Sequence, residues 1–206
     1  MRIMPLMRCR RSPSGRSRAR TLGFLVLLGV LSGVLSTLAD SPGVPAQLQA
    51  DLVAKLATFD RNFAQRAGDT ARVVLLVNEG DARSRLSANA MKSALGQIDR
   101  IGGLPTRTTT VAFESAGAVA KTCRDDHVAI LYVTQGLEDR IEEIRSSLSG
   151  VDVLSVAAIP EYVPRGVVIG FEVVSGKPKI LLNLRQAKAQ NVNFKADVLS
   201  LMKVLQ

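Results

Sequence analysis

The chain offers few residues that could carry acid–base or metal chemistry. His127 is the only histidine, and Asp125 and Asp126 stand directly before it. A carboxylate beside an imidazole can relay a proton, so this trio is the one acid–base candidate. A zinc site needs three or four ligands, mostly nitrogen or sulfur, and a lone imidazole does not supply them. Because an apolar run follows at once, we interpret the trio as the turn at a helix end. We expect no catalytic residue and no metal site.

Motifs for nucleophiles and for phosphate binding are also missing. No Gly-x-Ser-x-Gly elbow occurs, which argues against a serine hydrolase. Segment 78–81 (NEGD) lacks the lysine and the spaced glycines of a phosphate-binding loop or a dinucleotide fingerprint. Gly102 and Gly103 are expected to end a helix, where glycine takes the left-handed cap. The sequence therefore favours a protein that binds over one that catalyses, and it indicates no cofactor.

A set of polar residues stands where a binding site would lie. Each stands in the loop after a predicted strand, and in open α/β sheets ligands sit beyond the carboxyl ends of the strands. The main candidates are Asn78, Glu79, Gln135 and Glu161, with Asp81, Thr134 and Tyr162 beside them. We expect them to form one polar rim for a small molecule or a partner loop; ordinary solvated loops are the alternative.

Apolar patterns predict the elements that would position this rim. Strands are expected at 72–77 (RVVLLV), 106–113, 128–133 (VAILYV) and 151–157. Apolar residues at helical spacing predict helices at 46–66, 86–98, 115–124 and 137–148. Strands that alternate with helices form βαβ units, so we expect a parallel sheet covered on both faces.

The segment from Val153 onward has the most distinctive order. Two strand-like segments, 167–174 and 178–184, are joined across Ser175-Gly176-Lys177, which predicts a hairpin because glycine supplies the positive φ of a short turn. Apolar residues at helical spacing then predict a terminal helix over 194–205. The expected fold is a single three-layer α/β domain with a mainly parallel sheet, a C-terminal antiparallel hairpin and a terminal helix.

The positive charge of the chain is concentrated at its N-terminus. The formal net charge is +9, but seven arginines precede residue 22, in a region without acidic residues. Without them, 20 basic residues remain against 18 acidic ones, and the chain has no tryptophan. A clustered basic face is the footprint of nucleic-acid binding, and it is missing here. We therefore expect no nucleic-acid partner.

The same N-terminus has the order of a secretory signal peptide. An arginine-rich leader is followed by the apolar run 22–35 (LGFLVLLGVLSGVL) and then by small residues up to Ala39. We expect cleavage between Ala39 and Asp40, which defines a signal peptide (1–39), a linker (40–45) and a folded domain (46–206). The run is shorter than the roughly 20 apolar residues of a membrane span, so no stable insertion is expected after cleavage. A retained anchor is the alternative.

Cleavage would also decide whether an intramolecular disulfide can form. The chain has two cysteines, Cys9 in the leader and Cys123 in the folded domain. Once the leader is removed only Cys123 remains, so no intramolecular disulfide can form. We interpret Cys123 as a small, partly buried residue of the helix before a strand; a reactive or intermolecularly paired thiol is the alternative. A homodimer is left open as the assembly.

The order of the C-terminal half resembles a known family. A strand with Gly166-x-x-x-Gly170-Phe171 is followed by a second strand that ends in Leu182-Asn183-Leu184, then by Ala187 and an apolar C-terminal segment. This order is similar to that of the YfiR family of bacterial periplasmic proteins. The resemblance is clear from Val128 to the end and weaker over 45–71. We interpret Gly166, Gly170, Phe171, Asn183, Leu184 and Ala187 as residues that define the fold, with Asn183 bonding local backbone where the second strand ends.

The resemblance implies a function without chemistry. YfiR-like proteins are expected to act from the periplasm by repressing a membrane-bound diguanylate cyclase, which tunes cyclic-di-GMP and biofilm behaviour. The implied protein is a non-enzymatic, exported regulator that contacts the periplasmic segment of an inner-membrane diguanylate cyclase or sensor kinase. The alternative is a periplasmic solute-binding module that uses the strand-end rim. Family members often carry disulfides, whereas this chain retains only Cys123 after cleavage. This departure from the family leaves the identity of the partner open.

Overall fold

The computed structural model describes residues 43–205. The predicted signal peptide and the cleavage site between Ala39 and Asp40 lie outside the described residues and remain predictions.

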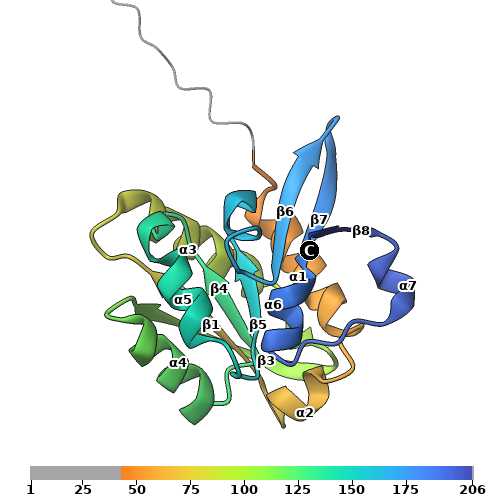
Figure 1. Cartoon of the computed structure of the whole chain (residues 1–206), viewed down its shortest axis with the longest axis horizontal. Coiled ribbons are helices and arrows are strands. Elements are labelled where there is room, and N and C mark those ends of the chain that lie inside the picture. The colour runs from red at the N-terminus through yellow and green to blue at the C-terminus, as the bar shows by residue number, and fades with distance from the viewer. Residues whose placement is uncertain (1–42, 206) are drawn as a thin grey trace, which may run out of the picture. The chain divides into compact units, whose positions relative to one another are not determined.

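An eight-stranded sheet forms the middle layer of the fold. The strands are β1 (Ala71–Val77), β2 (Arg100–Ile101), β3 (Leu104–Ala112), β4 (Ile130–Val133), β5 (Leu154–Ala157), β6 (Ile169–Val174), β7 (Lys177–Asn183) and β8 (Met202–Leu205). Their order across the sheet is β2-β3-β1-β4-β5-β6-β7-β8 (Figure 1). Strands β3, β1, β4, β5 and β6 are parallel, β7 is antiparallel to β6, and β8 is parallel to β7. This confirms the mainly parallel α/β fold with a C-terminal antiparallel hairpin.

Helices cover both faces of this sheet. They are α1 (Ala46–Ala57), α2 (Phe63–Ala67), α3 (Ala82–Leu95), α4 (Ala116–Asp125), α5 (Ile141–Ser147), α6 (Leu184–Ala189) and α7 (Ala196–Leu199), with the 3₁₀ turns η1 (Glu138–Arg140) and η2 (Pro160–Tyr162). Side chains of β1 alternate between two apolar cores: Val73 and Leu75 pack with α1 and α3, whereas Val74 and Leu76 pack with α4 and α5. Burial on both faces explains why β1 and β4 are continuous apolar runs.

The hairpin between β6 and β7 has a turn of two residues. Ser175 (φ 51°) and Gly176 (φ 74°) both have positive φ, as in the type I′ turn that matches the twist of paired strands. Six residue pairs align across the hairpin, from Ile169 opposite Leu182 to Val174 opposite Lys177. The predicted hairpin is confirmed.

The predicted terminal helix over 194–205 is wrong. One helical turn, α7, is followed by a strand, β8, that pairs with β7 from Met202 opposite Ile180 to Leu205 opposite Asn183. Phe194, Val198 and Met202 are buried as helical spacing predicts, but Leu201 is 67% exposed. The four residues of β8 gain backbone hydrogen bonds from β7, whereas a short isolated helix would have to supply all of its hydrogen bonds itself.

Two helix boundaries also differ from the prediction. The helix expected over 46–66 is divided into α1 and α2 by a turn that contains Asp60. Helix α3 ends at Leu95, and Gly102-Gly103 forms the turn between β2 and β3 and not a helix end. Periodicity continued across both breaks because turn residues such as Phe59 and Ile98 still pack on the core.

Candidate functional site

The loops that follow β1 and β4 are bonded into one unit at the rim. The Asn78 side-chain amide donates to the Gly136 carbonyl (2.8 Å), and the Asn78 N–H donates to Ser84 Oγ (2.8 Å). Thr134 Oγ1 donates to the Leu76 carbonyl and lies 2.6 Å from Ser84 Oγ. Asn78 and the loop that carries Gln135 are therefore brought together by their own polar groups.

A charged cluster covers the same loops. The Asp81 carboxylate caps α3 by accepting from the backbone N–H groups of Arg83 (2.7 Å) and Ser84 (3.3 Å). The Arg83 guanidinium lies 2.9 Å from Asp81 Oδ2 and 3.9 Å from Glu138 Oε1. Its side-chain hydrogen bond lowers the pKa of the Asp81 carboxyl. The charges at this part of the rim are thus largely compensated among themselves.

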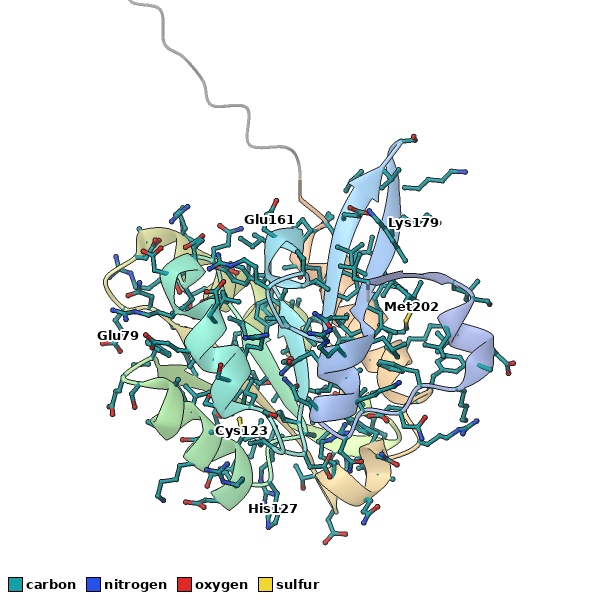
Figure 2. The ribbon with its side chains drawn as sticks, viewed as in Figure 1. Glu79, Cys123, His127, Glu161, Lys179 and Met202 are labelled. Carbon is teal, nitrogen blue, oxygen red and sulfur yellow. The ribbon has the colours of Figure 1, made fainter. Side chains whose placement is uncertain are left out.

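Glu79 and Glu161 do not join this cluster. Both are exposed, and Figure 2 shows Glu79 at one side of the molecule and Glu161 at the end above the sheet, each pointing outward. Within residues 43–205, no hydrogen bond links either carboxylate to Asn78 or Gln135. The four rim candidates therefore span a broad surface and do not surround one pocket.

A hollow of about 300 Å³ lies beside Gln135, between α1, α3 and the end of β4. It is lined by Val44, Ala46, Gln49, Arg83, Leu86, Ser87, Ala90, Tyr132, Gln135 and Ala158. We call this the rim groove. At its floor Tyr132 Oη donates to Gln49 Oε1 (3.0 Å), and Gln49 Nε2 donates to the Val44 carbonyl (2.7 Å). Burial raises the pKa of the Tyr132 hydroxyl. These polar groups are occupied with one another, so they are poorly placed to orient a small molecule.

Leu86 is the residue of the rim groove that the sequence did not reveal. Helical spacing placed it on the buried face of α3, but its side chain is 69% exposed at the edge of the groove. Ala90 and Ala158 beside it leave room for an incoming side chain. Leu86 thus adds one exposed apolar side chain to the edge of the groove. No pattern distinguishes Leu86 from the core residues of its helix.

The His127 trio lies elsewhere, at the end of α4. Asp126 caps the end of α4, and His127 follows with φ 49°. The Asp125 carboxylate pairs with Lys121 on its own helix, which lowers the pKa of Asp125. Figure 2 places His127 at the end of the molecule opposite Glu161. The prediction of a helix-end turn is confirmed.

Cys123 faces the core from α4, and we expect it to be nearly inert. Its side chain is buried, and desolvation raises the pKa of the thiol from 9.0 to about 12. A rise of that size reduces the thiolate about 1,000-fold at pH 8. In the full-length Cys9→Ser variant, an aromatic disulfide reagent at pH 8 should therefore react at once after unfolding in guanidinium and very slowly in buffer. Equal rates in the two conditions would contradict this burial.

The residues of the family-like pattern lie around the base of the β6–β7 hairpin. Gly166 has φ 120°, a conformation that L side chains rarely adopt, and packs on the Arg145 side chain. Asn183 Oδ1 accepts from the Gln186 N–H (2.9 Å) at the start of α6, and its Nδ2 donates to the Val163 carbonyl (2.8 Å). Phe171 and Ala187 are buried, and Leu184 is partly buried. The pattern thus ties the hairpin to the loop before β6 and to α6.

The described residues offer neither a metal site nor a membrane-spanning helix. Between residues 43 and 205, no group of three or more His, Cys, Asp or Glu side chains is arranged to hold a metal ion. Within the same range, every helix is too short or too polar to cross a bilayer.

Comparison with solved structures shows a shared fold at low identity. A conserved domain protein from Vibrio cholerae O1 biovar El Tor str. N16961 aligns with 12% identity and a TM-score of 0.57, covering 79% of this chain and 60% of that one. The ABC domain in complex with L-Trp from Streptococcus pneumonia aligns with 15% identity and a TM-score of 0.54, covering 79% and 62%. The chain thus spans about three fifths of the length of these two structures.

Comparison of the sequence with family models is more decisive. No curated protein matches the chain. The model of the YfiR/HmsC-like family (DUF4154) matches residues 46–203, which is nearly all of the described structure. The chain therefore belongs to the YfiR/HmsC-like family.

Proposed function

We propose that this protein represses an inner-membrane diguanylate cyclase, or another inner-membrane signalling partner such as a sensor kinase, by binding its periplasmic segment at the rim groove. Family membership supports a periplasmic regulatory role in cyclic-di-GMP signalling. The single observation that carries the choice of surface is Leu86, 69% exposed beside a hollow of about 300 Å³.

The chemistry of the groove fits a protein segment. Leu86, Ala90 and Ala158 offer an apolar contact, and Gln135 offers an amide beside them. Arg85 precedes Leu86 on α3 but does not line the groove; its guanidinium donates to the Glu79 backbone carbonyl (2.9 Å), and no carboxylate among residues 43–205 forms a salt bridge with it. An apolar side chain flanked by an acidic residue would satisfy both the leucine and this arginine.

A solute-binding module is the second candidate. The rim groove has a volume near the lower end of small-molecule sites, and one fold relative is a domain in complex with L-Trp. Against it, the polar groups on the floor of the groove bond one another, and Leu86 at its edge is exposed. A thermal-shift screen of amino acids against the protein separates the candidates, since a solute-binding module should be stabilised by its ligand.

The proposal is tested in the native host. Deletion of the gene should raise cellular cyclic-di-GMP several-fold, measured by mass spectrometry, and the wild-type gene should reverse the rise. Leu86→Asp should fail to reverse it, because burying a carboxylate in an apolar contact is costly. Leu201→Asp is the matched control, since Leu201 is 67% exposed and is not part of the rim groove.

Three outcomes bear on the proposal. Unchanged cyclic-di-GMP after deletion would overturn the regulatory function itself. Equal complementation by Leu86→Asp and Leu201→Asp would overturn the assignment of the groove. Alanine substitutions at Glu79, Gln135 and Glu161 then test how far the contact extends, with capture of the partner from solubilised membranes as the measurement. Intact capture by all three would remove the rim from the interface.

A further inference from the structure

The hairpin of β6 and β7 projects beyond the rest of the described structure (Figure 1). All seven residues from Val173 to Lys179 are exposed, and Val173 and Val174 are 43% and 44% exposed. The I′ turn at Ser175-Gly176 holds the two strands in register out to the tip. A stiff element with two uncovered valines at its end is therefore presented to the surroundings.

Charge is distributed unevenly around this hairpin. Strand alternation places Lys177 and Lys179 on one face, and the pairing of Leu181 with Lys203 adds the lysine of β8 to it. The one acidic residue of that face in β6–β8, Glu172, is partly buried, with Oε1 3.1 Å from Lys203 Nζ. The surplus charge on this face is positive. The opposite face carries the apolar pair Val173 and Pro178 at the tip.

The position of the chain start points to a membrane as the occupant. Seven residues, 36–42, separate the apolar run 22–35 from Gly43, and such a segment spans at most about 25 Å. In Figure 1 the first described residues, in orange, leave the body at the end from which the hairpin projects. In a chain that retains the apolar run, which is the alternative to cleavage, a bilayer that receives this run would lie within about 25 Å of Gly43, at the end from which the hairpin projects.

We propose that the β6–β7 hairpin docks on the surface of an anionic phospholipid bilayer. Val173 and Val174, which lie on opposite faces of the hairpin tip, enter the interfacial region, while Lys177 and Lys179 beside the tip contact lipid phosphates. Long lysine side chains can lie along apolar surface with the ammonium group in the headgroup layer. Apolar contact and attraction to anionic lipid add together in such binding. The contact would hold the regulator at the membrane where its proposed partner resides, but it does not depend on that partner.

The test is a vesicle co-sedimentation assay. The probe is a set of protein-free vesicles of phosphatidylcholine alone or mixed with phosphatidylglycerol. The protein is the chain from Asp40 to Gln206, which forms one compact unit. Binding should require phosphatidylglycerol and should weaken with added salt. Lys177→Glu/Lys179→Glu should reduce the partition coefficient at least about tenfold, and Val173→Ser/Val174→Ser about fivefold.

Lys55→Glu/Lys92→Glu provides the matched control. It makes the same change in net charge on α1 and α3, outside the hairpin, and should bind nearly as the wild type does. All variants change exposed residues, and thermal unfolding checks that they remain folded. Equal binding to neutral and anionic vesicles would overturn the proposal, as would equal losses for the hairpin and control variants. Hairpin-dependent binding seen only with native, protein-containing membranes would assign this surface to a protein.

Discussion

Replacement of Arg66 by methionine is expected to lower the free energy of unfolding by about 3–5 kcal/mol. The Arg66 side chain is only 1% exposed, and its Nη1 lies 2.7 Å from Asp60 Oδ2. Its Nε lies 2.6 Å from Asp152 Oδ1, and Nη2 donates to the Asn191 carbonyl (3.0 Å). The Asp60 side chain is fully buried, so removal of the guanidinium leaves a buried carboxylate without its counter-charge.

The cost is large because the network joins the turn after α1 and helix α2 to two segments that are distant in sequence. Asp60 Oδ1 also accepts from the N–H groups of Asn62 (3.1 Å) and Asn193 (2.9 Å). The Arg66 guanidinium therefore joins four segments: the turn after α1, helix α2, the loop before β5 and the segment after α6. Loss of that group should loosen all four together.

Urea unfolding monitored by circular dichroism measures the effect. Arg83→Met is the control: Arg83 also pairs with an aspartate, but its side chain is 61% exposed, so a change of about 1 kcal/mol or less is expected. The double variant Asp60→Asn/Arg66→Met should recover part of the loss, because the orphaned charge is removed as well. A loss below 1 kcal/mol for Arg66→Met would show that the network contributes little.

Gly170→Ala is expected to destabilise the fold by about 1–3 kcal/mol. Gly170 lies in β6, where an added Cβ would overlap Val163 Cγ2 and would lie 3.5 Å from the Ala157 Cβ. Val163 and Ala157 are themselves buried, so neither can move into solvent to make room. The glycine lets β6 pack closely against the loop that follows β5.

Gly117→Ala should have the opposite sign. Nothing lies within 4 Å of an added Cβ at Gly117, which is in α4, so alanine should stabilise by about 0.5–1 kcal/mol through helix propensity. Midpoints of chemical unfolding for the two variants should therefore move apart. Equal shifts would contradict the close packing at Gly170.

The sheet could be predicted from the sequence because its central strands are buried on both faces. Continuous apolar runs such as RVVLLV and VAILYV are typical of strands buried on both faces. The short turn at Ser175-Gly176 contains a glycine, which indicates a tight hairpin. The C-terminal segment could not be predicted in the same way. Phe194, Val198 and Met202 satisfy helical spacing, yet the last of them belongs to a strand whose stability comes from pairing with β7.

Only part of the arrangement of the expected rim could be predicted from the sequence, because Glu79 and Glu161 lie apart from Asn78 and Gln135. The rule for parallel sheets correctly indicated that Asn78 and the Gln135 loop lie together at one edge, because both follow neighbouring strands. Leu86 could not be identified as an exposed residue, because its exposure depends on how far α1 packs along α3. The Arg66 network was equally hidden, because its charges come from positions 60, 66 and 152.

Strand β8 has a practical consequence for anyone who shortens or extends this protein at its C-terminus. Its four residues occupy the outer side of β7, whose backbone would otherwise present free N–H and C=O groups together with Leu181 and Leu182. An uncovered strand of this kind is a template for intermolecular pairing. Truncation before Met202 should therefore make the protein aggregate. Affinity tags are better placed ahead of α1 than at the C-terminus.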